Sequence, residues 1–398
     1  MKRWSLSFAI AAALAGGAAA QTASAASSEY YVTNLPSLGG TVARGNSIND
    51  LGLISGYSNL SGDGSRHAAA WLFGRVTDLN TLGGANSAVP WPVKNNFGVV
   101  SGVSQTGQPQ QRGESWSCVA GGFIPDDGHT CLGFVWAFGK MRALNPLPGG
   151  NNSFATGTNS FMQTAGWAET GYVDPTCNIH GDSDQVLQFL PVVWGPGKNQ
   201  IKSLPLETRD DSGAATALND RGQIVGISGI CDQAVGRETA KHAVLWENGH
   251  LTDLGNLGAL WWNTPMAINQ HGVVVGFAGD PDPANFNGDV THAFIWTRDG
   301  GMQRINPSAD DNSIAYGLNE RNQVVGYYVF TDGTLHGFIW DATHGMRDLN
   351  DPGLKQAGYT GVITVATDIN DFGVITGRAF DPATNEKPAF MAVPTHTH

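Results

Sequence analysis

Short apolar runs separated by Gly, Asn and Asp follow one another along most of the chain. The most regular unit is an apolar residue, then Asn, two further residues and Gly, with a second Gly four positions on, as in 48–56. Because Asn and Gly tolerate the left-handed backbone of a tight hairpin, this unit predicts a turn between two strands. Its Asn recurs seven times, at Asn49, Asn95, Asn159, Asn219, Asn269, Asn319 and Asn370.

Three copies of the unit are altered. Asn322 replaces the first Gly in the sixth copy, which the chemistry of the turn allows. Met162 takes that place in the third copy, and we expect it to mark the most distorted turn. In the second copy, Lys94 precedes the Asn where most copies have Ile or Leu. We therefore place Lys94 on an inner strand near the axis of the fold.

Two further apolar runs follow each turn. The first ends in Trp in six copies, as at 67–71, and is degenerate in the seventh, between Pro388 and Ala392. The second resembles Val76-Thr77-Asp78-Leu79. With the two runs on either side of the turn, each repeat holds four short apolar runs. Four such runs are the content of one four-stranded propeller blade. The sequence predicts an all-β, seven-bladed β-propeller.

The seventh repeat lacks its last run, and the segment 31–35 near the start of the chain matches the missing piece. An N-terminal strand that completes the last blade closes the ring and removes exposed sheet edges. We expect a signal peptide at 1–20, a linker at 21–29, the propeller at 30–393 and a tail at 394–398.

The combination of His-Ala-Phe-x-Trp, as at 292–296, with Ile-Asn-x-x-Gly and Asp-Leu-Gly-x-Leu-Gly resembles the bacterial extracellular HAF-repeat family. The resemblance covers essentially all of the chain after the N-terminal segment, and it implies an exported repeat protein without assigning an activity. Kelch propellers are the competing interpretation, but here the Gly pair follows the run that resembles Val76-Thr77-Asp78-Leu79 rather than lying within the blade.

The N-terminal segment has the pattern of a secretory signal. Lys2 and Arg3 precede an apolar stretch from Trp4 to Ala15, and small residues lead to Ala20, where we expect cleavage. No later stretch is apolar enough to span a membrane. We predict a secreted or periplasmic protein without membrane insertion.

The chain is acidic, with a formal net charge of -12 and 34 Asp and Glu against 22 Lys and Arg. Because nucleic-acid binding needs clustered cations, this balance argues against a nucleic-acid partner. We expect a monomer that needs no cofactor. Ca²⁺ is the alternative, on an oxygen-rich loop that includes Asp280, Asp282 and Asp289.

Blades two and three are oversized, because successive repeat Asn residues are 46, 64, 60, 50, 50 and 51 residues apart. The extra residues fall between the second and third strands, at 104–131 and 167–189, with shorter segments at 229–240 and 278–291. These loops share one face of a propeller. Every cysteine lies in them, and we expect two disulfides, Cys118 with Cys131 and Cys177 with Cys231. The bridges either rigidify a binding face or only protect long loops.

Five Trp residues outside the repeat pattern map toward the same face. Aromatic planes there suit stacking on sugar rings, whereas the alternative is that they pack beneath the loops. The predicted ligand is therefore an extracellular glycan or another surface ligand. The five residues are Trp91, Trp116, Trp167, Trp261 and Trp262.

A polysaccharide lyase or glycosidase on that face is the second hypothesis, with Tyr172, His180 and Lys94 as candidate catalytic residues. Lys94 would neutralise a carboxylate, unless it pairs with an Asp of a loop. A protein-interaction platform is the third hypothesis. The repeated His67, His242, His292 and His336 sit on separate blades, so we interpret them as structural rather than as metal ligands.

Overall fold

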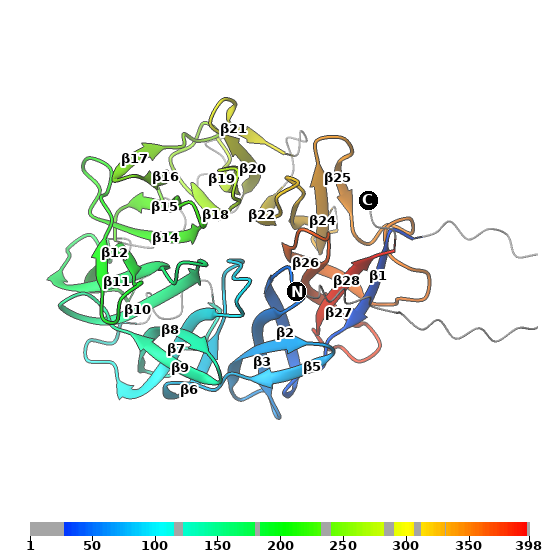
Figure 1. The fold of residues 1–398 in the computed structure, drawn as a ribbon, viewed down its shortest axis with the longest axis horizontal. Coiled ribbons are helices and arrows are strands. Elements are labelled where there is room, and N and C mark those ends of the chain that lie inside the picture. The colour runs from blue at the N-terminus through cyan, green and yellow to red at the C-terminus, as the bar shows by residue number, and fades with distance from the viewer. Residues whose placement is uncertain are drawn as a thin grey trace, which may run out of the picture.

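The computed structural model describes residues 28–114, 122–179, 184–231, 240–281, 290–305, 312–330 and 332–395. These residues form seven four-stranded antiparallel sheets arranged as blades around a centre (Figure 1). The prediction of an all-β, seven-bladed propeller is confirmed. Within the described ranges, no helix is long and apolar enough to cross a membrane.

The first three blades, from the innermost to the outermost strand, are β2 (Gly39–Ile48), β3 (Ile54–Leu60), β4 (Arg66–Leu72) and β5 (Arg75–Asp78); β6 (Gly83–Ala88), β7 (Val100–Pro109), β8 (His129–Ala137) and β9 (Lys140–Leu144); and β10 (Gly149–Thr158), β11 (Thr164–Val173), β12 (Leu187–Trp194) and β13 (Ile201–Ser203). The next three are β14 (Ser212–Leu218), β15 (Ile224–Gly229), β16 (His242–Glu247) and β17 (His250–Asp253); β18 (Thr264–Ile268), β19 (Val274–Gly279), β20 (Thr291–Thr297) and β21 (Gly301–Arg304); and β22 (Ser313–Leu318), β23 (Val324–Val329), β24 (Leu335–Asp341) and β25 (Gly345–Asp348).

The seventh blade joins the two ends of the chain. Its strands are β26 (Val362–Ile369), β27 (Ile375–Phe380), β28 (Ala389–Pro394) and β1 (Tyr30–Asn34). β1 pairs antiparallel with β28, so that Tyr30 lies opposite Pro394 and Asn34 opposite Phe390. The predicted closure by the N-terminal strand is confirmed.

The seven repeat Asn residues form a closed ring of hydrogen bonds. The Nδ2 group of Asn49 donates to the backbone oxygen of Asn95, and each following Asn does the same to the next blade, at 2.8 to 3.2 Å. Asn370 completes the ring by donating to the backbone oxygen of Asn49 at 3.1 Å. The Oδ1 atom of each Asn meanwhile accepts from its own turn, as Asn49 does from Leu51 and Leu53. One residue type therefore shapes the turn and joins neighbouring blades.

The fourth residue of every turn has a positive φ, as the Asn-x-x-Gly pattern predicts. Gly52 has a φ of 80° and Asn322 a φ of 59°. Met162 adopts a φ of 61° and keeps the hydrogen bond from its backbone N to the oxygen of Asn159. The expectation of a distorted third turn was wrong, because the shared hydrogen bonds hold Met162 in a strained but regular conformation.

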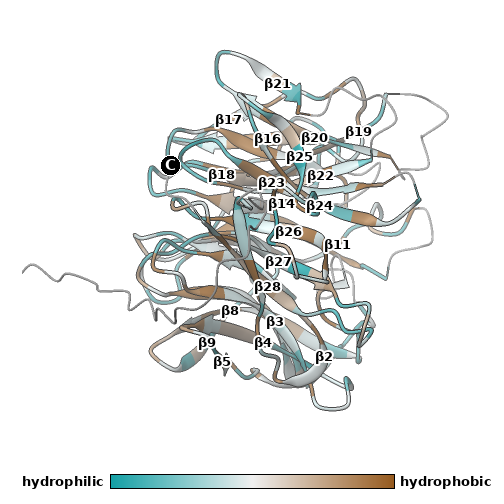
Figure 2. Ribbon diagram, turned by 90° about the vertical axis from the view of Figure 1, so that its right-hand side faces the viewer, coloured by the Kyte–Doolittle hydropathy of each residue, from teal (hydrophilic) through white to brown (hydrophobic). Residues whose placement is uncertain are grey.

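The repeat His and Trp residues tie strands and blades together. His67 and His336 each contact an Asp on the outermost strand of the same blade, Asp78 at 2.9 Å and Asp348 at 2.6 Å. The repeat Trp of the first blade donates from Nε1 to the backbone oxygen of Pro36 at 2.7 Å. In the side view of Figure 2, hydrophobic colour follows the strands within the disc. These contacts agree with a structural role for the repeat His residues.

Candidate functional site

The strand order gives the propeller two distinct faces. We call the side with the loops between second and third strands and the connections between blades the insertion face. We call the opposite side, which holds the Asn-x-x-Gly turns, the turn face. Loops on a rigid scaffold are common places for binding residues, so each face has its own candidate site.

The Trp residues predicted to bind a ligand divide into two groups. Trp91 is 6% exposed and Trp167 0% exposed, and Trp167 stacks on Phe154 with ring centroids 4.0 Å apart. These two rings pack beneath the loops, so they do not present a plane to solvent. Trp261 and Trp262 are half-buried, whereas Trp116 lies outside the described residues.

Three half-buried aromatic residues contact the apolar cluster that contains Trp91 and Trp167. Phe123, Trp262 and Tyr316 all pack against this cluster, and we call them the aromatic rim. The backbone of Trp262 has a φ of 57°, a conformation that an aromatic residue seldom adopts. The rim comes from loops of the second and fifth blades and from the inner strand of the sixth. It therefore lies around the axis toward the insertion face.

An Arg–Tyr cluster adjoins the rim through Tyr316. The cluster consists of side chains from the first, sixth and seventh blades. Arg44 lies opposite Tyr57 in the β2–β3 register, and its Cζ atom is 5.0 Å from the centre of the Tyr316 ring. Tyr316 in turn lies 5.9 Å from Tyr327, measured between ring centroids. The members are Arg44, Tyr57, Tyr316, Tyr327 and Arg378.

The two guanidinium groups of this cluster influence each other. Burial and the nearby charge of Arg44 lower the pKa of Arg378. Burial also acts to lower the pKa of Arg44, but the phenols of Tyr316 and Tyr57 outweigh it and raise that pKa. Arg44 is 8% exposed, and its Nε group donates to Thr367 Oγ1 at 3.2 Å. Both groups remain cations, because the pKa of Arg starts above 12.

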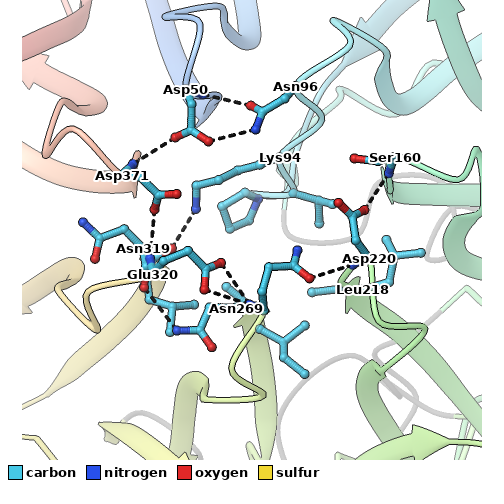
Figure 3. A pocket seen from close by; sticks show the side chains of 17 residues that line it. Asp50, Lys94, Asn96, Ser160, Leu218, Asp220, Asn269, Asn319, Glu320 and Asp371 are labelled. Atoms are coloured by element: carbon cyan, nitrogen blue, oxygen red, sulfur yellow. Dashed lines mark hydrogen bonds between the residues drawn. The ribbon is translucent and has the colours of Figure 1, made fainter.

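A separate cavity of about 160 Å³ lies within the ring of turns on the turn face. Lys94 reaches into it (Figure 3), where its Nζ group donates to Leu318 O at 2.7 Å and contacts Asp368 Oδ1 at 2.9 Å. Burial raises the pKa of Asp368 to about 6, although Lys94 acts against this shift. Lys94 thus has a buried partner, but on β26 rather than on a loop. It also lies beyond the end of β6 rather than on an inner strand as predicted.

Carboxylates line this cavity and take part in a chain of hydrogen bonds that links neighbouring turns. Asp50 Oδ1 accepts from the backbone N of Asp371 at 3.0 Å, and Asp371 Oδ1 accepts from the backbone N of Glu320 at 2.9 Å. Glu320 accepts from Gln270, and Gln270 from Asp220, in the same way. The acidic groups therefore stabilise neighbouring turns by satisfying their backbone amides.

Six exposed apolar side chains lie on turns of the turn face in the seventh, first, second and third blades. Phe138 is 98% exposed and Phe73 91% exposed, both on turns between third and fourth strands. The others lie on Asn-x-x-Gly turns of successive blades. The turn-face patch consists of Leu51, Phe73, Phe97, Phe138, Phe161 and Phe372.

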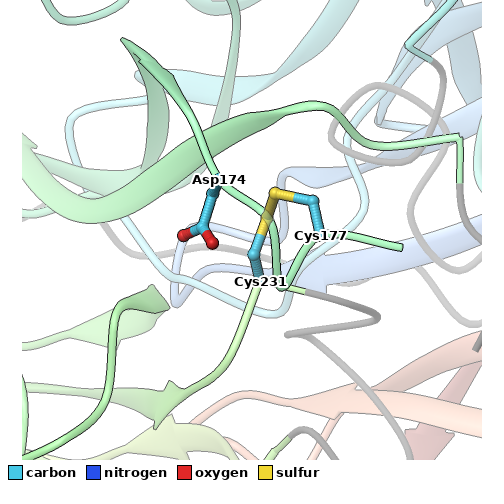
Figure 4. A group of neighbouring side chains, drawn as sticks. All are labelled: Asp174, Cys177 and Cys231. Atoms are coloured by element: carbon cyan, nitrogen blue, oxygen red, sulfur yellow. A yellow bond between two sulfur atoms is a disulfide. The ribbon is translucent and has the colours of Figure 1, made fainter. Parts of the chain in front are cut away.

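Cys177 and Cys231 form a disulfide that joins the third and fourth blades, as predicted. Asp174 lies beside it (Figure 4). Because both sulfur atoms belong to the bridge, they are not metal ligands. Cys131 is also disulfide-bonded, whereas Cys118 lies outside the described residues.

The candidate lyase residues are not brought together. Tyr172 is 58% exposed near the insertion-face end of β11, whereas Lys94 lines the cavity on the turn face. The structure separates them because they stand at opposite ends of their blades. His180 falls outside the described residues. So do Asp282 and Asp289, and Asp280 accepts from His292 Nε2.

Sequence reasoning missed the Arg–Tyr cluster. Its members come from β2, β3, β22, β23 and β27, so no local pattern joins them. One signal was present. Five positions before the repeat Asn stands Arg44 in the first copy, but Phe154 and Ile314 in the third and sixth.

No protein-family model and no curated protein matches the chain. Among solved structures, the β-propeller domain of the Trilobed protease from Pyrococcus furiosus is similar over 91% of this chain and 93% of that chain, with 9% identity and a TM-score of 0.49. An Aleuria aurantia lectin in complex with alpha-methyl-L-fucoside is similar over 83% and 97%, with 10% identity and a TM-score of 0.41. A puromycin-hydrolyzing peptidase from Mycobacterium tuberculosis is similar over 92% and 56%, with 11% identity and a TM-score of 0.45. Likenesses of this degree say nothing about what the chain binds.

Proposed function

We propose that this protein is an exported propeller of the HAF-repeat family that binds a glycan on its insertion face. The observation that carries this proposal is the aromatic rim. Phe123, Trp262 and Tyr316 are each half-buried and pack on one apolar cluster. Rings held in this way offer rigid apolar planes to a sugar without the entropy cost of ordering a loop.

The disulfide between Cys177 and Cys231 supports export, because disulfides persist in oxidising compartments. It also fixes the loop of the third blade to that of the fourth. Both loops border the insertion face, so the bridge supports a preorganised site there.

The test is binding of a panel of acidic and neutral polysaccharides to the purified protein, followed by Trp fluorescence. Trp262→Ala and Phe123→Ala should each weaken binding by about fivefold, since an aromatic contact contributes on the order of 1 kcal/mol. Phe138→Ala is the matched control, because this ring is exposed on the turn face. Equal losses in all three variants, or no binding by the wild type, would contradict the proposal. Release of unsaturated sugar products would instead favour the lyase hypothesis.

A protein-interaction platform on the turn face is the second candidate function. It is favoured by the turn-face patch, because exposed apolar groups on adjacent blades are typical of protein contact surfaces. The test is co-purification from the culture medium with the wild type and with a Phe97→Ser, Phe138→Ser variant. A partner that the double variant loses and Trp262→Ala retains supports the platform. A partner retained by both variants argues against it.

A further inference from the structure

We propose that the Arg–Tyr cluster binds an oxyanion carried by the glycan, either a carboxylate or a sulfate ester. This inference rests on the proposed glycan-binding function and specifies the chemical class of its ligand. The oxyanion would lie against Arg378 and the phenols, with Arg44 behind them, while the sugar ring lies on the aromatic rim.

The first support is that the positive charge of the cluster has no internal counter-charge. Neither Arg44 nor Arg378 forms an ion pair with any carboxylate of the described residues. The Nη2 atom of Arg44 is buried and has no hydrogen-bond partner there. Leaving one nitrogen of a buried guanidinium without a partner is unfavourable, so such an atom is unusual unless something outside the chain completes it.

The second support is the contrast with three other cations of the same chain. Lys94 contacts Asp368, Arg298 contacts Glu247 at 2.7 Å, and Arg347 contacts Glu29 at 2.8 Å. The chain has 34 acidic residues, so a carboxylate near Arg44 and Arg378 would be easy to supply. Phenols surround them instead. A phenol stabilises a cation through its ring and still donates its O–H group to an anion.

The third support is access. Tyr316, Tyr327 and Arg378 are half-buried, so each has surface available to a ligand, whereas Arg44 and Tyr57 form the closed base. Arg44 stands four residues before Ile48 along β2, which corresponds to about 13 Å from the turn-face end of the strand. Arg44 also stands five residues after Gly39, so the cluster lies near the middle of the inner strands, and it adjoins the insertion face through Tyr316 of the aromatic rim.

The geometry of the donors fits an oxyanion with several oxygens. A guanidinium donates two parallel N–H bonds to a carboxylate or sulfate, and such charge-assisted bonds are stronger than neutral ones. Because Tyr316 belongs to both the cluster and the aromatic rim, the charged group and the sugar ring of one residue fit side by side. A neutral glycan would leave the positive charge of Arg378 without a counter-charge.

The experiment measures binding of polygalacturonate, a sulfated dextran and neutral dextran at constant ionic strength to the full-length mature protein. Arg378→Gln and Arg44→Met should each weaken binding of an acidic polymer at least about tenfold, since a hydrogen bond to a charged group contributes on the order of 2 kcal/mol. Binding of neutral dextran should stay unchanged. Arg75→Gln, an exposed residue of β5, is the matched control. Preference for polygalacturonate or for sulfated dextran identifies the oxyanion.

A second measurement keeps this inference separable from the proposed function. Galacturonate and inorganic sulfate should raise the melting temperature of the wild type above that in sodium chloride of equal ionic strength, and Arg378→Gln should abolish the rise. If polymers bind but acidic and neutral ones bind equally and the Arg variants have no effect, the oxyanion site is wrong and the glycan function stands. If no polymer binds but the anion-specific rise occurs, the oxyanion site stands and the glycan function fails. If neither occurs, both fail.

Discussion

Cations in two regions near the propeller axis differ in whether the chain supplies them with a negative partner. Near the turn face, Lys94 contacts a fully buried carboxylate. The surrounding carboxylates accept hydrogen bonds from the backbone N–H groups of neighbouring turns. Near the middle of the inner strands, where the Arg–Tyr cluster adjoins the aromatic rim, Arg44 and Arg378 face phenols and no carboxylate of the described residues. The first arrangement is complete within the chain. The second lacks a negative charge, which is why we place the ligand there.

The first prediction breaks the pairing at the turn face. Lys94→Met should lower the free energy of unfolding by about 4 kcal/mol at pH 8, because it leaves Asp368 buried without its partner. Arg44→Met should lower the free energy of unfolding far less, since Arg44 has no carboxylate partner that the substitution would leave buried and unpaired. Urea denaturation measures both, with exposed Lys140→Met as the control. Equal losses of unfolding free energy for Lys94→Met and Arg44→Met would contradict the claim that only Lys94 has a buried carboxylate partner.

The second prediction concerns the rigidity of the insertion face. Replacing Cys177 and Cys231 together by Ser should lower stability by about 3 kcal/mol, because the bridge closes a long loop. The same change should weaken glycan binding and leave the turn face intact. Thermal unfolding and polysaccharide binding check the two effects. Full stability with full binding would show that the bridge only protects loops.

The third prediction follows from Asp368, whose pKa burial raises to about 6 from 3.8. The folded state therefore binds the proton of the Asp368 carboxyl more tightly than the unfolded state does. The resulting contribution to the free energy of unfolding is present below about pH 4 and is lost as the pH rises through about 6. Between pH 4 and pH 7, the free energy of unfolding of the wild type should fall by between about 2 and 3 kcal/mol relative to that of Asp368→Asn. Urea denaturation across this range tests it, and a difference that stays flat would contradict a buried titrating carboxyl.

The smallest effect lies at the third turn. Met162 has a φ of 61° where most copies have Gly. Met162→Gly should therefore raise stability by about 1 kcal/mol, because Gly adopts this conformation without strain. Gly52→Ala, at the matching position of the first blade, should lower stability. Thermal unfolding of both variants tests this prediction. A lower melting temperature for Met162→Gly would mean that packing of the Met162 side chain outweighs the backbone strain.

The fold was predictable because its information is local and repeated. Each Asn-x-x-Gly unit shapes its own turn, so seven copies predict seven blades, and the segment 31–35 could be matched to the missing strand by sequence alone. The packing of Trp91 and Trp167 was not predictable in the same way. Whether a ring is covered depends on partners such as Phe154, which belongs to another blade than Trp91.

The site was less predictable than the fold, because it depends on which side chains meet across blades. Arg44 and Tyr316 are far apart in sequence and meet only when the ring closes. Lys94 was correctly placed near the axis, yet its partner Asp368 lies on the seventh blade. Arg44, at an inner-strand position where the third and sixth copies have Phe154 and Ile314, was a local sign of the cluster.

Hydrogen exchange of the full-length protein with and without polygalacturonate tests the account most directly. We predict protection in the segments that carry Trp262, Tyr316 and Arg378, and unchanged exchange in the turns that carry Phe97 and Phe138. Protection confined to those turns would contradict a ligand site on the insertion face and would assign binding to the turn face instead.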